Sequence, residues 1–114
     1  MAGLDIAGLD RALAEIAEGD PSNAIRTELA RSLSLKAAQE RYEAFLERAP
    51  SFIAAQARIR SGEALRIALD AHDAARNLAA SALGLSLDAQ GTVFEMGSIV
   101  ARLASISPPA ISRR

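Results

Sequence analysis

Cysteine and tryptophan are absent from this 114-residue chain, and lysine and valine are nearly absent. The lack of cysteine excludes a disulfide framework, thiolate zinc sites, iron–sulfur clusters and a thiol nucleophile. Alanine fills 26 positions and valine only two, a balance that favours helices over sheets. The net charge of −1 lacks the positive excess typical of a domain that coats nucleic acid or anionic lipid.

The length of the chain suits one small domain, because typical domains contain about 100 to 200 residues. The first residues, Met1 to Asp5, show neither the basic nor the apolar segment of an export signal. No uncharged stretch reaches the roughly 20 residues that span a bilayer. We therefore expect a single helical domain over residues 1–114, located in the cytoplasm and not in a membrane.

Apolar residues at helical spacing predict three helices in the first half of the chain. The first two carry the stripes Leu9, Leu13, Ile16 and Ile25, Leu29, Leu33, separated by the stop signal Gly19-Asp20-Pro21 and a cap at Ser22 or Asn23. The third is predicted over residues 35–49, ending before Pro50. Together, residues 9–49 are expected to form an N-terminal helical lobe.

A run without proline follows, from Ser51 to Leu83. As one helix it would be about 50 Å long, whereas a compact sphere of this chain length is only about 34 Å across. Either the helix breaks at Ser61-Gly62, or it protrudes from the domain and is covered by another subunit. We favour the second alternative.

The last predicted helix covers residues 92–106 and ends near Pro108. Residues 52–83 and 92–106 would then form a long antiparallel helical hairpin over 52–106, with a flexible tail at 107–114. The predicted fold class is thus all-α: short N-terminal helices followed by a long antiparallel helical hairpin that oligomerises.

A helix-turn-helix pattern is present between Thr27 and Tyr42. Ala30 supplies the small residue that lets two helices cross closely, and Leu35 follows the turn. Lys36, Gln39 and Arg41 would be the DNA-binding residues of the second helix. Nearby glutamates would face phosphates unfavourably, so an ordinary helix pair is the alternative interpretation.

Side chains for catalysis or metal binding are few. His72 is the single histidine, and no carboxylate occupies a position that shares its helical face. Glu43 and Glu47 can share one face of a helix, but a solvated face explains them without an acid–base role. No phosphate-binding glycine loop or nucleophile elbow is present. We expect no enzyme activity, no metal and no cofactor.

The main hypothesis is therefore a non-enzymatic assembly or adaptor subunit that forms a homo-oligomer and meets a protein partner through the N-terminal lobe or the C-terminal tail. A helix-turn-helix transcriptional regulator is the alternative. The expected oligomer interface consists of apolar residues of the hairpin: Phe52, Ile59, Leu65, Leu69, Leu78, Val93, Met96, Val100 and Leu103.

The layout over residues 24–106, a helix-turn-helix followed by a helical hairpin, resembles the small terminase subunit of phage-type packaging machines. This resemblance implies a ring built by the hairpin, a tail that engages the large motor subunit, and DNA recognition through Lys36, Gln39 and Arg41. A ring can strengthen weak individual DNA contacts through multivalency.

Overall fold

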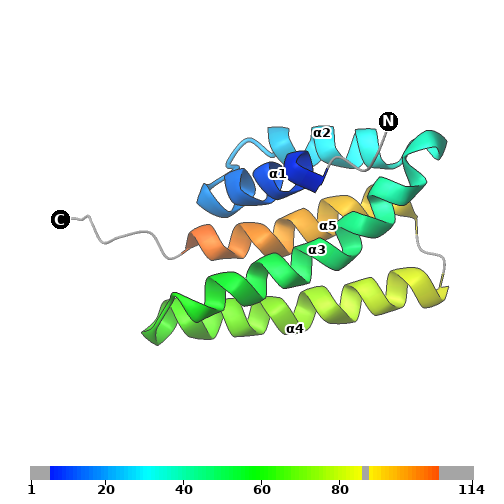
Figure 1. Ribbon diagram of the computed structural model, residues 1–114. Helices are drawn as coiled ribbons and strands as arrows, with labels where there is room; N and C mark the ends of the chain where they lie inside the picture. The colour runs from blue at the N-terminus through cyan, green and yellow to red at the C-terminus, as the bar shows by residue number, and fades with distance from the viewer. Residues whose placement is uncertain (1–5, 86–87, 106–114) are drawn as a thin grey trace.

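The computed structural model describes residues 6–85 and 88–105 of the chain. These residues form five α-helices and two short 3₁₀ turns, with no strand in either described range (Figure 1). The elements in chain order are α1 (Ile6–Glu18), α2 (Ala24–Leu33), η1 (Lys36–Ala38), α3 (Gln39–Arg58), α4 (Gly62–Leu85), α5 (Ala89–Ala101) and η2 (Arg102–Ser105). The prediction of an all-α fold is confirmed. The predicted tail at 107–114 lies outside the described residues.

The helices form an elongated bundle measuring 47 × 25 × 25 Å. In Figure 1, α1 and α2 lie along one side, α4 lies along the opposite side, and α3 and α5 run between them. The most extensive contacts join α3 to α4 and α2 to α5. Helix α4 is therefore an outer helix, covered on one face by α3 and α5.

One continuous apolar core joins all five helices. The larger side chains come from α1, α2, α3 and α5, whereas α4 contributes mainly alanine. Small residues let α4 approach its neighbours closely, which explains why an alanine-rich segment suits this position. The largest fully buried side chains are Leu9, Leu13, Ile16, Leu33, Phe45, Leu46, Ile53, Val93, Met96, Val100 and Leu103.

Helix α3 does not end before Pro50, as its sequence predicted, but continues to Arg58. Proline lacks the N–H that would bond to the carbonyl four residues earlier, at a typical cost of about 3 kcal/mol inside a helix. The buried side chains of Leu46, Ala49 and Ile53 lie on one stripe that spans the proline. Burial of this stripe on both sides of Pro50 requires the helix to continue.

The prediction of one long helix from Ser51 to Leu83 is also wrong, because the chain breaks between α3 and α4. The amide of Ile59 makes short-range bonds to carbonyls at the end of α3, and Gly62 then adopts a left-handed φ of +59°. Glycine takes this conformation without the steric cost that a side chain would add. The argument that self-association is needed to cover one over-long helix therefore no longer holds.

The break changes the composition of the helical hairpin. The long antiparallel pair consists of α3 and α4, joined through residues 59–61, rather than of residues 52–83 and 92–106. The predicted boundary between a lobe at 9–49 and a hairpin at 52–106 falls inside α3. Helix α5 packs against α1 and α2 as well as the hairpin, so it belongs to the common core.

The start of α2 is capped by Asp20 rather than by Ser22 or Asn23. Asn23 has a left-handed φ of 64° and makes no side-chain cap. Instead, the Asp20 carboxylate accepts hydrogen bonds from the amides of Ile25 (3.1 Å) and Arg26 (3.0 Å). A carboxylate at a helix N-terminus satisfies free N–H groups and opposes the helix dipole.

The same carboxylate forms an ion pair with Arg26, whose Nε lies 2.9 Å from Oδ2 of Asp20. One Nη of Arg26 donates to the hydroxyl of Ser98 on α5 (3.2 Å), and the guanidinium lies 5.5 Å from the centre of the Phe94 ring. Burial alone would raise the pKa of Asp20, but the hydrogen bonds from Arg26 and Ile25 outweigh it and lower this pKa. The cluster thus fixes α2 against α5.

Candidate interaction surface

The predicted DNA-binding residues lie near the corner between α2 and α3. Lys36 is exposed in η1, and the exposed Gln39 donates a 2.9 Å hydrogen bond to Glu43. Arg41 is half-buried, and its Nε has no hydrogen-bond partner. Exposed Glu40 follows Gln39 directly. This corner thus carries charges of both signs.

Four of the predicted interface residues are interior residues of the chain itself. Val93, Met96, Val100 and Leu103 are each exposed by at most 1%. Because α5, which carries the first three, and η2, which carries Leu103, are enclosed by neighbouring helices, these side chains form the core and do not reach the surface. The prediction that these four residues form an oligomer interface is therefore wrong.

The other predicted interface residues occupy different environments. Phe52 and Leu78 are half-buried and pack against the core. Ile59 is 78% exposed, but it lies in the connection between α3 and α4. Leu65 and Leu69 lie together on the outer side of α4 and line a common groove. The structure therefore brings only two of the nine residues together on the surface.

This groove lies between α3 and α4 near the end where the two helices connect. Its volume is about 340 Å³, and it is lined by Ala54, Ala57, Arg58, Leu65, Leu69 and His72. Leu69 remains 50% exposed. A shallow apolar groove between two helices is a suitable surface for a further helix.

A second hollow lies between the same two helices toward the other end of the hairpin. It is lined by Glu43, Leu46, Glu47, Ala79, Ala80 and Leu83. Leu83 is 64% exposed, although it was not among the residues expected at the interface. We call the surface formed by these two hollows the hairpin face.

The sequence contained a signal for the hairpin face. Residues 65, 69, 72, 76, 79 and 83 alternate at intervals of four and three, the spacing of a helix that packs against another helix. This second stripe is hard to distinguish in the sequence, because the same helix also carries an alanine stripe. The alanine stripe faces the core. Only the position of α3 shows which of the two stripes is already covered.

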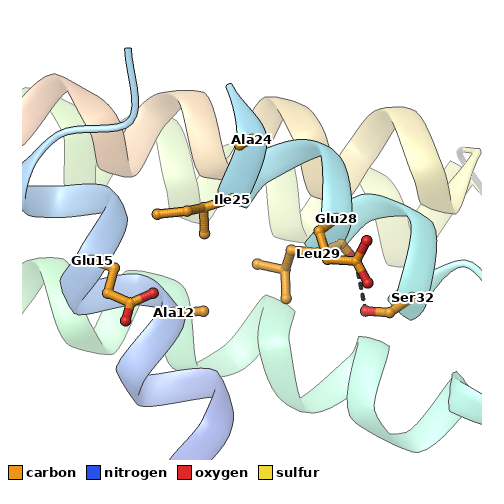
Figure 2. A pocket seen from close by; sticks show the side chains of 7 residues that line it. All are labelled: Ala12, Glu15, Ala24, Ile25, Glu28, Leu29 and Ser32. Atoms are coloured by element: carbon orange, nitrogen blue, oxygen red, sulfur yellow. Dashed lines mark hydrogen bonds between the residues drawn. The ribbon is translucent and has the colours of Figure 1, made fainter. Parts of the chain in front are cut away.

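A third hollow lies between α1 and α2, on a different part of the molecule (Figure 2). Figure 2 shows Ala12, Ile25 and Leu29 in its apolar part, with the carboxylates of Glu15 and Glu28 at its edge. The Glu28 carboxylate forms an exposed ion pair with Arg31 of the same helix. This hollow belongs to the N-terminal helices, one of the two places where a protein partner was expected.

Within the described residues, no three histidine or acidic side chains gather in a way that could hold a metal ion. His72 is half-buried on α4 and lines the hairpin face. None of the helices in this part of the chain combines the length and apolar character needed to cross a membrane.

Comparison of the chain with protein-family models, with curated proteins and with solved structures finds no match. A functional assignment therefore rests on the surface features described above.

Proposed function

We propose that this chain is a non-enzymatic assembly or adaptor subunit that self-associates through the hairpin face. The observation that carries the proposal is the pair of apolar hollows between α3 and α4, with Leu69 and Leu83 half or more exposed. Complete burial of a leucine side chain contributes about 1.5–3 kcal/mol, so a second subunit on this face gains free energy from both residues. The cytoplasmic location expected from the sequence is part of this proposal.

The mass of the purified protein in solution tests this function. At tens of micromolar, sedimentation equilibrium should give a mass clearly above the 12.0 kDa of one chain. Leu69→Glu and Leu83→Glu should each shift the mass toward that of the monomer, because each places a charge in the apolar groove.

Ile59→Glu is the matched control. Ile59 is more exposed than either leucine but lies outside both hollows, so this substitution should leave the mass unchanged. A wild-type mass of a single subunit at this concentration would contradict the proposed function.

A small-terminase-like role in DNA packaging is the particular form of the proposal that the resemblance implies. It requires duplex DNA to bind at the corner between α2 and α3. Exposed Lys36 and half-buried Arg41 supply the positive charge for phosphate contacts there.

Salt-dependent binding to duplex DNA tests the packaging role. Lys36→Glu and Arg41→Glu should each weaken binding and reduce its dependence on salt. DNA binding by a monomer would favour the helix-turn-helix regulator. Self-association without DNA binding would leave the assembly function and remove the packaging role.

A further inference from the structure

The two hollows of the hairpin face lie on the same side of the α3–α4 pair. On α4 the lining residues fall within the stripe from Leu65 to Leu83, with Ala80 beside it. On α3 the lining residues 43, 47, 54 and 57 recur at helical spacing and lie on one face of the helix. From Leu65 to Leu83 the two hollows, together called the groove, span roughly 27 Å of α4, at 1.5 Å per residue.

The two ends of this groove carry opposite charges on α3. Glu43 and Glu47 line the end near Leu83, whereas Arg58 lines the end near Leu65. Within the described residues, Arg58 forms no ion pair and the carboxylate of Glu47 accepts no hydrogen bond. The hairpin face therefore has an acidic end and a basic end, and both retain unused charge.

A second copy can meet this face through a two-fold axis in two simple ways. If the axis runs along the helices, each α3 lies over the α4 of the other copy and like ends coincide, so the acidic ends of both copies gather together and both Arg58 side chains lie at the other end. If the axis runs across the helices, each α3 lies antiparallel over the other α3. The acidic end of each copy then meets the basic end of the other.

We propose that the hairpin face binds a second copy of this chain in the antiparallel arrangement, with Glu43 and Glu47 of each copy facing Arg58 of the other. A two-fold interface uses every contact twice, so both ends of the groove are paired. The same rotation brings Leu83 of one copy over Leu65 of the other, since these residues lie at opposite ends of the groove. This inference rests on the proposed function and specifies its geometry as a closed dimer, in place of the ring that the terminase resemblance implies.

Charge reversal tests the arrangement, with the dissociation constant of the dimer measured by sedimentation equilibrium. Glu47→Arg and Arg58→Glu should each weaken self-association by on the order of tenfold or more, because each creates two like-charge contacts per dimer. The double variant Glu47→Arg/Arg58→Glu should regain much of the lost association, because positions 47 and 58 again carry opposite charges and only Glu43 keeps a like-charge contact at each end. A mixture of the two single variants should form a heterodimer, since positions 47 and 58 carry opposite charges at both of its ends.

Matched controls on α1 carry the same changes of charge. Glu18→Arg and Arg11→Glu alter exposed residues away from the hairpin face and should leave the dissociation constant unchanged. Far-ultraviolet circular dichroism should show the same helicity for every variant, which separates lost association from lost folding.

The outcomes distinguish this inference from the proposed function. If the wild type dimerises and Leu69→Glu disrupts the dimer, but the single charge reversals do not weaken it or the mixture fails to form a heterodimer, the antiparallel arrangement is overturned and the proposed function stands. A monomeric wild type overturns both.

Discussion

The side chain of Arg26 fills the space next to Gly97, where a β-carbon would lie 2.7 Å from its Cγ. Glycine at this position of α5 allows the base of the arginine side chain to pass close to the helix. From there the guanidinium reaches both Asp20 and Ser98. The cluster that joins α2 to α5 therefore depends on a missing side chain as well as on charge.

Gly97→Ala should destabilise the protein by about 1–2 kcal/mol. Alanine gains about 1 kcal/mol over glycine in a helix interior, but the clash falls on the base of Arg26 and disturbs its hydrogen bonds to charged and polar groups. The free energy of unfolding, measured by urea denaturation, gives the net effect.

Gly84→Ala is the control for the same change of residue. No atom lies within 4 Å of a β-carbon at position 84 in α4. This variant should be more stable than the wild type by about 0.5–1 kcal/mol. Equal effects of the two substitutions would contradict the role assigned to Gly97.

Asp20→Asn should destabilise the protein by about 3 kcal/mol at pH 7. The side chains of Asp20 and Arg26 are only 2% and 13% exposed, and loss of the carboxylate leaves a largely buried guanidinium without its counter-ion. Urea denaturation at a series of pH values gives the size of this loss and its pH dependence.

The pKa of Asp20 is lower in the folded state than its ordinary value of 3.8. Its stabilising effect is therefore complete well above pH 3.8 and is lost as the pH falls through the folded-state pKa. The difference in stability between wild type and Asp20→Asn should shrink over this acid range. A difference that stays constant down to about pH 2 would contradict the ion pair.

Ile53→Ala should cost about 2–5 kcal/mol, because Ile53 is completely buried and its truncation leaves a cavity in the core. Ile59→Ala should change the free energy of unfolding by less than about 0.5 kcal/mol, since Ile59 is largely exposed in the connection between α3 and α4. Thermal and urea denaturation should show a clear difference in the free energy of unfolding between the two variants. A large loss of stability in Ile59→Ala would contradict the exposed position of this connection.

Much of the interior could be predicted from the spacing of apolar residues. The stripes Leu9, Leu13, Ile16 and Ile25, Leu29, Leu33 predict two helices, and these helices are α1 and α2. Five of these six side chains are buried, and Ile25 packs against the core. Local periodicity is sufficient here because one face of each short helix is apolar and must be covered.

The candidate site was harder to predict because its residues belong to two helices whose pairing is not encoded locally. Leu65 and Leu69 were expected at an interface, but so were Val93 and Met96, which have similar apolar character and lie in the core. Leu83 was not included. A sequence pattern shows that a helix has an apolar face, but not whether its own chain covers that face.

Composition and the spacing of apolar residues are enough to predict a protein built from helices, since alanine is abundant, valine is scarce and apolar residues recur at helical intervals. The packing of the helices was needed to show that α3 continues through Pro50, that the chain turns at Gly62, and which stripe of α4 remains exposed. The physical reason is that local preferences of about 1–3 kcal/mol per residue are outweighed when a whole apolar stripe is buried at once.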